Sequence, residues 1–344
     1  MILVTGGTGL VGAHLIFDLI RSGRKVRALR RDTSSMAVIN RVFHHDPALL
    51  EKVEWAVGDV TDLYSILEAL EGVTEVYHCA AVISFNPREF SEMMRINVQG
   101  TSNMVNLSLE KGIAKFCHLS SVAALGRVEE GKIITEETVW KTSKSNSNYA
   151  ISKYSAEREV WRGAEEGLSV VVVNPSVILG AGDWNQGSSK LFRQVWNGLR
   201  FYTGGMTGFV DVRDVSSCCT SLMDKNIFNK RFILNSENIS YQSLLSFIAE
   251  GFHKRAPQIL AKPFLAELAW RVEGIRSWFL KSSPLITKET SRNGSKKWTY
   301  SNERIRKELD FNFIPVKKSA EDACLVYLQE MKQDQSQPEK VEQV

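Results

Sequence analysis

The sequence predicts an α/β fold built on a doubly wound parallel sheet, with a smaller mixed lobe toward the C-terminus. First, short β-rich runs alternate with helical segments through the first half of the chain, which is typical of a parallel sheet covered by helices on both faces. Second, Val170–Val173 is a run of four valines, as expected of a strand buried on both faces. Third, a glycine-rich loop at Thr5–Gly12 follows the first strand and opens a helix.

The expected elements follow in order along the chain. A strand at Ile2–Val4 leads into a helix at Leu10–Ser22, which Gly23 ends as a C-terminal cap. Further elements are expected as strands at Lys25–Leu29, Val53–Ala56, Glu75–Cys79, Lys115–Leu119 and Ser169–Val173, with helices that include Glu92–Lys111 and Tyr149–Glu165.

The pattern changes after Asn174, where glycine-rich loops appear. Short strands are expected at Phe209–Val212 and Arg231–Asn235, and Gln258–Leu280 has the pattern of an amphipathic helix. We expect that helix to be buried in the lobe rather than to rest on a membrane surface. The expected domains are a sheet domain over 1–175 and 209–236, a lobe over 176–208 and 237–332, and a polar, disordered tail over 333–344.

Composition narrows the class of protein. The 344 residues carry a net charge of +4 and no long basic run, so no nucleic-acid partner is expected. The five cysteines have neither metal-site spacing nor a disulfide pattern, so no metal and a reducing compartment are expected. The N-terminus lacks the pattern of a signal peptide, and no segment approaches the ~20 apolar residues of a membrane span. We therefore expect a cytoplasmic protein with no integral membrane span.

The glycine loop T-G-G-T-G-L-V-G has the physical properties of a dinucleotide site. Gly6 allows a tight turn, Gly9 lets the backbone approach a pyrophosphate, and Gly12 allows the helix to pack closely on the strand. A plain tight turn is the alternative, but the strand–loop–helix context favours the cofactor. The candidate cofactor-binding residues here are Thr5, Gly6, Gly7, Thr8, Gly9, Leu10, Val11 and Gly12.

The end of the second strand predicts which dinucleotide is bound. An acidic residue at this position suits the ribose 2′-hydroxyl of NAD, whereas arginine suits the 2′-phosphate of NADP. Arg30 and Arg31 occupy the position and Asp32 comes slightly late, so NADP is preferred over NAD. The alternatives are a solvated basic loop, or an Asp32 that turns inward.

Two later strand ends add candidate cofactor contacts. Asp59 and Val60 are placed to meet an adenine, with a capping role for the aspartate as the alternative. Ala80 and Ala81 end the fourth strand, where small residues leave room for a cofactor or simply pack in the core.

Polar residues that could perform chemistry follow the fifth and sixth strands. Ser120 and Ser121 lie at the C-terminal end of a strand, where ligands bind in open α/β sheets. Tyr149 and Lys153 are four residues apart on the next helix and therefore share one face. The segment that begins N-P-S-V after the sixth strand adds Asn174, Pro175, Ser176 and Val177 as candidate cofactor contacts, with Pro175 fixing a turn.

Taken in order, these motifs resemble the extended short-chain dehydrogenase/reductase family. The resemblance rests on T-G-G-T-G-L-V-G, G-D-V, C-A-A, L-S-S, Y-x-x-x-K and N-P-S-V-I-L-G, and it covers the chain to about Leu328. It is closest to the branch that resembles dihydroflavonol 4-reductase and 3β-hydroxysteroid dehydrogenase. It implies a Rossmann-type dinucleotide-binding domain, a substrate-binding C-terminal lobe and an NAD(P)-dependent oxidoreductase.

The resemblance also implies roles for individual residues. Tyr149 is the expected general acid/base, Lys153 holds the nicotinamide ribose, and Ser121 hydrogen-bonds the substrate oxygen. A free phenol titrates near ~10, and a nearby ammonium together with the nicotinamide charge is expected to lower that pKa. Asn97 matches a family asparagine near the site, and a bond from its helix to the neighbouring strand is an equal alternative.

The expected reaction is hydride transfer between nicotinamide and a carbonyl or secondary alcohol of a small, fairly apolar substrate. Nucleotide-sugar dehydratases of the family place acids after the catalytic hydroxyl residue, whereas Val122 and Ala123 follow Ser121 here. A nucleotide-sugar epimerase with tightly bound NAD is the alternative. A cofactor-binding sensor without turnover is less favoured, because the tyrosine and the lysine are both present.

The lobe and the surface carry further expectations. Trp184, Phe192, Trp196, Phe201 and Tyr202 are expected to be mostly lobe core, with one or two of them lining a substrate pocket. Three cations there, Lys190, Arg193 and Arg200, are expected on a solvated face rather than on a diphosphate. A homodimer is expected through the helices Glu92–Lys111 and Tyr149–Glu165. The apolar residues available there, which could equally be core, are Met93, Met94, Met104, Val105 and Leu109.

Overall fold

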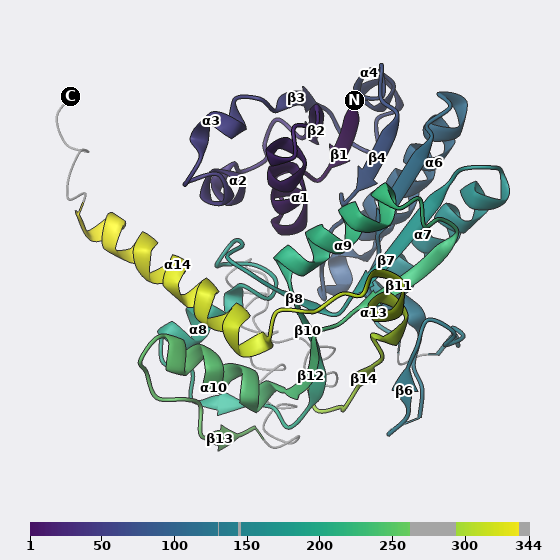
Figure 1. Ribbon diagram of the computed structural model, residues 1–344. Helices are drawn as coiled ribbons and strands as arrows, with labels where there is room; N and C mark the ends of the chain where they lie inside the picture. Colours follow the sequence, from purple (N-terminus) through teal and green to yellow (C-terminus); the bar gives the residue numbers. More distant parts are fainter. Residues whose placement is uncertain (130, 144–145, 262–293, 337–344) are drawn as a thin grey trace.

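The computed structural model describes residues 1–129, 131–143, 146–261 and 294–336, and a parallel sheet lies at its centre (Figure 1). Seven strands pair in the order β11-β7-β5-β4-β1-β2-β3, and every pairing is parallel. They are β1 (Ile2–Thr5), β2 (Val26–Arg30), β3 (Glu54–Val57), β4 (Glu75–His78), β5 (Lys115–Leu119), β7 (Val170–Pro175) and β11 (Lys230–Leu234). The chain winds outward from β1 in both directions, as the sequence predicts.

Helices cover both faces of this sheet because successive strand side chains point to opposite faces. Val171 and Val173 pack in one apolar cluster, and Val170 and Val172 pack in another. The first cluster includes residues of α1 (Leu10–Arg21), α2 (Ala37–Val42) and α9 (Val212–Asp224). The second includes residues of α4 (Leu63–Ala69), α6 (Gly100–Glu110) and α7 (Asn148–Glu165). The valine run is therefore buried on both faces, as predicted.

The expected strands of the first half begin and end within two residues of the observed strands. The sixth of them, β7, continues two residues further than predicted. Asn174 and Pro175 belong to β7 and pair with Ile233 and Leu234 of β11, so Pro175 does not form the turn that we predicted. The proline is tolerated because the pairing of β7 with β5 ends at Val173, and the missing N–H faces that side. Ser176 resumes the bonding by donating its N–H to the Leu234 carbonyl at 2.9 Å.

The expected helix Glu92–Lys111 is continuous, but its middle part is π-helical. It runs from α5 (Phe90–Met94) through a π-helical stretch at Arg95–Gln99 into α6. Met93, Met104 and Val105 are fully buried, so these three residues are core within the chain.

A smaller lobe contains a mixed sheet and three helices around their own apolar cluster. Its elements are β8 (Val177–Leu179), α8 (Lys190–Trp196), β10 (Met206–Asp211), β12 (Glu237–Ser240), α10 (Tyr241–Gly251) and α14 (Val316–Ser336). Four short strands pair beside it as β9 (Phe201–Tyr202) with β13 (Ile259–Leu260) and β6 (Ile133–Ile134) with β14 (Thr299–Tyr300). The helix α13 (Glu303–Leu309) returns to the large sheet, where Ile305 joins the first cluster.

Two expectations fall at the edges of the described chain. The predicted helix Gln258–Leu280 begins instead with the short strand β13, and its residues from 262 onward lie outside the described residues. The helix α14 continues to Ser336, so 333–336 is helical rather than a frayed tail, and 337–344 lies outside the described residues. In the part of the chain that the structure describes, no helix has the length and apolar character needed to cross a membrane.

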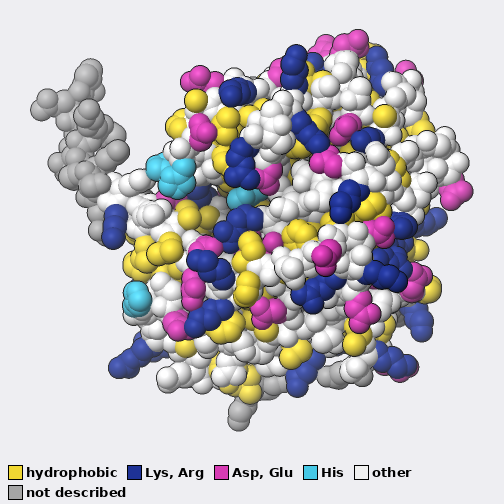
Figure 2. All heavy atoms as spheres, viewed as in Figure 1, with side chains coloured by type: hydrophobic (Ala, Val, Ile, Leu, Met, Phe, Trp, Pro, Cys, Tyr) yellow, Lys and Arg dark blue, Asp and Glu magenta, His cyan; other side chains and the backbone are white. Residues whose placement is uncertain are grey.

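The two charge signs are interspersed over the surface. Figure 2 shows Lys and Arg side chains next to Asp and Glu side chains across the face in view, which agrees with a net charge of only +4.

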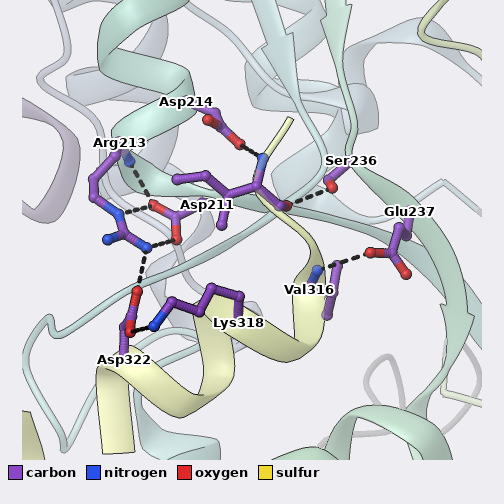
Figure 3. A network of polar contacts seen from close by, with 9 residues as sticks. Asp211, Arg213, Asp214, Ser236, Glu237, Val316, Lys318 and Asp322 are labelled. Atoms are coloured by element: carbon purple, nitrogen blue, oxygen red, sulfur yellow. Dashed lines mark hydrogen bonds and ion pairs between the residues drawn. The ribbon is translucent and has the colours of Figure 1, made fainter. Parts of the chain in front are cut away.

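A polar network attaches α14 to the start of α9 (Figure 3). Asp211 caps α9 and accepts hydrogen bonds from the Arg213 backbone N–H at 2.8 Å and from its Nε and Nη2 at 2.9 and 2.7 Å. Arg213 also reaches Asp322 of α14 at 2.9 Å. Lys318 pairs with the other oxygen of Asp322 at 2.7 Å. Asp211 is only 3% exposed, so its charge depends on the arginine.

The segment that leads into α14 is held by three further bonds in the same view. Asp214 accepts from the Ile314 N–H at 2.8 Å, and Ser236 donates to the Ile314 carbonyl at 2.7 Å. Glu237 accepts from the Val316 N–H at 2.9 Å. At the other end of α14, Glu330 pairs with Arg41 of α2. The lobe is thus joined to the sheet domain at both ends of this helix.

Removing Arg213 is expected to lower stability in a pH-dependent way. Burial raises the pKa of Asp211, but the hydrogen bonds from Arg213 and Ser319 outweigh it and leave the pKa below the ordinary value. Stability from this carboxylate is therefore present above about pH 4 and is lost as the pH falls through the lowered pKa. In Arg213→Ala the free energy of unfolding should fall by about 2 kcal/mol at pH 7 and by less at pH 3. The figure is smaller than the cost of breaking a fully buried ion pair, because the arginine is half-exposed.

Urea unfolding of wild type and variant at the two pH values measures this difference. Lys318→Ala is the control, since its ion pair with Asp322 is largely exposed and should change stability by under about 0.5 kcal/mol. An equal loss at pH 7 and pH 3 in Arg213→Ala would contradict the role given to Asp211.

Candidate active site

The glycine loop joins β1 to α1 through backbone contacts too close for other residues. Gly6 has a φ of +66°, and a Cβ there would lie 2.8 Å from the Ala80 nitrogen. A Cβ on Gly12 would lie 2.2 Å from the Gly6 carbonyl oxygen, so α1 packs directly on the loop. Gly9 precedes α1, which has neither a side-chain cap nor an acidic residue in its first turn. An uncapped helix N-terminus behind a bare backbone loop fits a pyrophosphate.

Of the other residues of the glycine loop, some lie at its surface and some are buried in the core. Thr8 and Leu10 are half-buried, and Gly9 is exposed. Gly7 and Val11 are buried, with Val11 in the first apolar cluster, so they shape the loop from beneath.

Thr5 ties the end of β4 to this loop. Its Oγ1 accepts hydrogen bonds from the backbone N–H groups of Cys79 and Ala80, both at 3.2 Å, and lies 2.8 Å from His78 Nδ1. Ala80 is half-buried and Ala81 is exposed. Because the Ala80 backbone lies where a Cβ on Gly6 would be, this close approach requires glycine at position 6.

Arginines gather at the ends of β2 and β3. The Arg30 guanidinium lies 5.8 Å from the centre of the Trp55 ring, and its Nε has no hydrogen-bond partner among the described residues. Arg31 and Asp32 are both exposed. Because the Arg30 Nε is buried, the exposed Arg31 guanidinium is the better placed of the two to meet an anion.

Asp59 has a local hydrogen-bonding role, and Val60 lies in the core. One Asp59 oxygen accepts from the Thr61 N–H and from the Thr61 hydroxyl, both at 2.8 Å. Burial raises the pKa of Asp59, but these bonds and the charges of Arg31 and Arg95 lower it overall. The Val60 side chain is buried against Gly100 of α6. Asp59 therefore stabilises the turn before α4, whereas the helix itself is capped by Asp62.

Ser121 and Tyr149 meet at the C-terminal edge of the sheet. Ser121 follows β5 and caps the short helix Val122–Leu125 by accepting from the Ala123 N–H at 3.2 Å. Tyr149 lies in the first turn of α7, which Ser147 caps by accepting from the Ala150 N–H at 2.9 Å. The two side chains are hydrogen-bonded to each other. The pair that the sequence predicts for the substrate oxygen is therefore assembled.

The acidity of Tyr149 differs from the expectation. Burial raises the pKa of the phenol and outweighs the lowering by the Ser121 hydrogen bond. The expected lowering required the Lys153 ammonium, but that group donates to the Leu119 carbonyl oxygen at 2.7 Å. Tyr149 in this structure is a protonated acid.

Lys153 is buried at 3% exposure beneath this pair. Burial lowers its pKa to about 8, against the opposing charge of Glu157. Its ammonium contacts the end of β5, so the structure places it beneath the Ser121–Tyr149 pair without a bond to either hydroxyl among the described contacts.

Three of the residues predicted to contact the cofactor have hydrogen-bond partners within the chain. Asn97 accepts from the Val82 N–H at 2.7 Å and donates to the Val82 carbonyl at 2.9 Å, so it holds the loop after β4, as the alternative proposed. Ser120 donates to Glu157 at 2.7 Å. Asn174 donates to the Ser121 carbonyl at 3.0 Å and to Glu157 at 2.9 Å.

Ser176 and Val177 lie where β7 passes into the lobe. Ser176 is buried and bonds to Leu234, and Val177 is half-buried at the start of β8. Sequence reasoning missed Glu157, although its position four residues after Lys153 on the same helix face was visible.

The lobe aromatics lie mainly in the lobe core. Trp184 and Trp196 line a surface cavity of about 290 Å³ between α8 and α14, and Phe192 is fully buried. Tyr327 and Met331 of α14 complete its apolar lining. Arg193 is hydrogen-bonded to Asn185 at this cavity, which agrees with a solvated rather than diphosphate-binding role.

Comparison with known proteins places this arrangement in a family. The chain matches the model of the NAD dependent epimerase/dehydratase family over residues 2–232. It is 31% identical over 269 residues to sterol demethylase protein B of Methylococcus capsulatus, which covers 77% of this chain and 78% of that protein. It is 28% identical over 327 residues to a putative dihydroflavonol 4-reductase of Synechocystis sp., which covers 93% and 92%.

A solved structure agrees over nearly the whole length. The crystal structure of gox2253 superposes with a TM-score of 0.80 at 29% identity, covering 96% of this chain and 98% of that one. The parallel sheet, the glycine loop and the Ser121–Tyr149 pair are thus found in a chain that belongs to the NAD-dependent epimerase/dehydratase family, within the extended short-chain dehydrogenases/reductases.

Proposed function

We propose that this NAD(P)-dependent oxidoreductase reduces the carbonyl of a small, fairly apolar substrate to a secondary alcohol, or runs the reverse oxidation. The observation that carries the proposal is the hydrogen-bonded pair of Ser121 and Tyr149 at the sheet edge. The names of the similar proteins, which include a sterol demethylase component and a dihydroflavonol reductase, support an apolar substrate.

The residues of the pair have distinct roles in this reaction. The nicotinamide, when bound, supplies or accepts the hydride. Tyr149 gives its phenolic proton to the substrate oxygen during reduction, and its raised pKa keeps that proton available at neutral pH. Ser121 donates a hydrogen bond to the same oxygen and orients it. Lys153, buried beneath, favours the phenolate that forms after the proton has left.

A nucleotide-sugar epimerase is the second candidate, because the family includes epimerases and dehydratases. That reaction needs tightly held NAD and a diphosphate site. Val122 and Ala123 after Ser121 supply no acid for the dehydratase reaction. An NAD molecule that copurifies and is not released by dilution would favour the epimerase, whereas stoichiometric consumption of NADPH with a ketone would favour the reductase.

The preference for NADP rests on charge at the end of β2. Arg31 is exposed, so its guanidinium is available to a 2′-phosphate, and Arg30 adds a second positive charge beside it, although its unpaired Nε is buried near Trp55. Asp32 is exposed as well and is the group that would favour NAD if it turned inward.

A homodimer in the cytoplasm completes the proposal. Met94, Leu109 and Trp161 remain half-buried on the α5–α6 and α7 segments and provide apolar surface for a partner copy. All five cysteines are free, which supports a reducing compartment.

Tyr149→Phe should abolish the proposed turnover while leaving the cofactor site intact. Loss of the proton donor is expected to lower kcat roughly 10²- to 10⁴-fold for reduction of a ketone, with little change in NADPH affinity. Stopped-flow measurement of NADPH oxidation and fluorescence titration of NADPH binding measure the two effects. Tyr154→Phe is the control, because Tyr154 only stacks on Trp140. Full turnover in Tyr149→Phe would reject Tyr149 as the proton donor.

Arg31→Ala should weaken NADPH binding more than NADH binding. Loss of one charge-assisted bond to the 2′-phosphate is expected to raise the Kd for NADPH about tenfold and to leave that for NADH unchanged. Fluorescence titration at two salt concentrations measures both. Arg21→Ala, at the opposite end of α1 from the glycine loop, should change neither. A parallel loss of both cofactors would reject the selector role.

Light scattering should give a solution mass twice that of one chain. Leu109→Glu should halve it, because a two-fold axis brings the same apolar surface of both copies together. Leu325→Glu on α14, where the leucine is 55% exposed, should leave the mass unchanged. A monomeric wild type would refute the dimer.

A further inference from the structure

Glu157 is a buried acid that the proposed reaction does not use. It lies on α7, one helical turn after Lys153 and two turns after Tyr149, so the three side chains share one helix face. Its side chain is only 3% exposed. A carboxylate removed from water is costly unless it is fully paired, so its partners indicate why it is placed there.

Its partners come from three adjacent strands. One carboxylate oxygen accepts from the Ser120 hydroxyl at 2.7 Å and from the Asn174 amide at 2.9 Å. The other accepts from the Trp161 indole at 3.1 Å and from the Arg231 guanidinium at 3.1 Å. Ser120 follows β5, Asn174 lies in β7 and Arg231 lies in β11. One carboxylate therefore attaches the helix that carries Tyr149 to the strand ends that face it.

The same bonds extend to Ser121. The Asn174 amide that donates to Glu157 also donates to the Ser121 carbonyl at 3.0 Å. Ser120 is further fixed by its N–H, which donates to the Val173 carbonyl at 2.8 Å. Glu157 is connected to Ser121 through Asn174 and to Tyr149 through the shared helix α7. The relative position of the Ser121 and Tyr149 hydroxyls therefore depends on Glu157.

Glu157 also supplies the negative charge that faces Lys153. The other titratable groups near this ammonium are His78 and Cys79 from the end of β4 and His118 from β5. Burial lowers the pKa of both histidines and raises the pKa of the Cys79 thiol, so all three are neutral at pH 7. Arg231 shares the Glu157 carboxylate from the far side. Among the described residues, Glu157 is the anion that opposes the burial of Lys153.

We propose that Glu157 is a positioning residue for the proposed reaction: it fixes Ser121 against Tyr149 and keeps the Lys153 ammonium charged in a buried site. The inference rests on the proposed oxidoreductase function for its kinetic consequence. Its electrostatic consequence can be measured without substrate or cofactor.

The direct test is the titration of Lys153 in protein labelled with 13C at the lysine Cε. The resonance is assigned by its loss in Lys153→Arg. In Glu157→Gln the Lys153 pKa should fall by about one unit from its value of about 8. In Arg231→Gln the Lys153 pKa should stay the same or rise, because in the described part of the chain Lys153 is then the remaining cation near the Glu157 carboxylate. An unchanged titration in folded Glu157→Gln, or an equal fall in Arg231→Gln, would overturn the electrostatic role.

The kinetic test separates charge from position. In Glu157→Gln, kcat should fall roughly 10- to 100-fold with a smaller change in KM, since the reacting hydroxyls are misplaced. The alkaline limb of the pH profile should also move about one unit lower, because Lys153 loses its proton earlier. Glu157→Asp keeps the charge, but its shorter side chain cannot reach both Ser120 and Asn174. The alkaline limb of its pH profile should therefore match that of the wild type, while its kcat should remain lower. A wild-type kcat in both variants would overturn the positioning role.

The two proposals fail in different ways. If no carbonyl substrate is turned over by wild type, the function is wrong, while the Lys153 titration still tests Glu157. If Glu157→Gln does not fold, Glu157→Asp serves as the test. The proposal then requires that Glu157→Asp keeps the wild-type Lys153 titration and has a reduced kcat. A Lys153 pKa in Glu157→Asp about one unit below the wild-type value would reject the inference, because the charge is retained in this variant.

Discussion

Burial of the central strands on both faces is the constraint on which the rest of this structure depends. A strand such as β7, with four consecutive valines in two apolar clusters, offers no face where a polar side chain can reach water. Functional groups are therefore restricted to the strand ends, and the winding of the chain brings the carboxyl ends of β1, β4, β5 and β7 together at one edge. The glycine loop, Ser121 and the start of α7 all lie there for this reason.

Polar side chains at that edge are nearly all paired with one another. Thr5, His78, Thr101, Asn97 and Ser152 form one hydrogen-bonded path from the glycine loop to α7. Glu157 is the centre of a second group that joins α7 to three strand ends. Polar atoms removed from water require such partners, so the site is fixed in position by the cost of leaving any of them unpaired.

The chemistry of Tyr149 illustrates how burial and contact compete. The i, i+4 spacing from Lys153 suggests that the ammonium lowers the pKa of the phenol, but Lys153 is drawn to the Leu119 carbonyl and burial raises that pKa. A protonated phenol next to Ser121 is suited to giving a proton to a carbonyl oxygen.

The sequence by itself determined the parallel sheet, the glycine loop and the shared helix face of Tyr149 and Lys153, because strand and helix periodicity, glycine sterics and a four-residue spacing are all local properties. Tertiary structure decided which partners the polar residues take. Asn174 and Pro175 became part of β7 because β11, far along the chain, pairs with that end. Asn97, Asp59 and Lys153 were predicted to face a cofactor, and in this structure each makes a short contact that the fold brings within reach. Burial and strand order set these choices, and neither is visible in a short stretch of sequence.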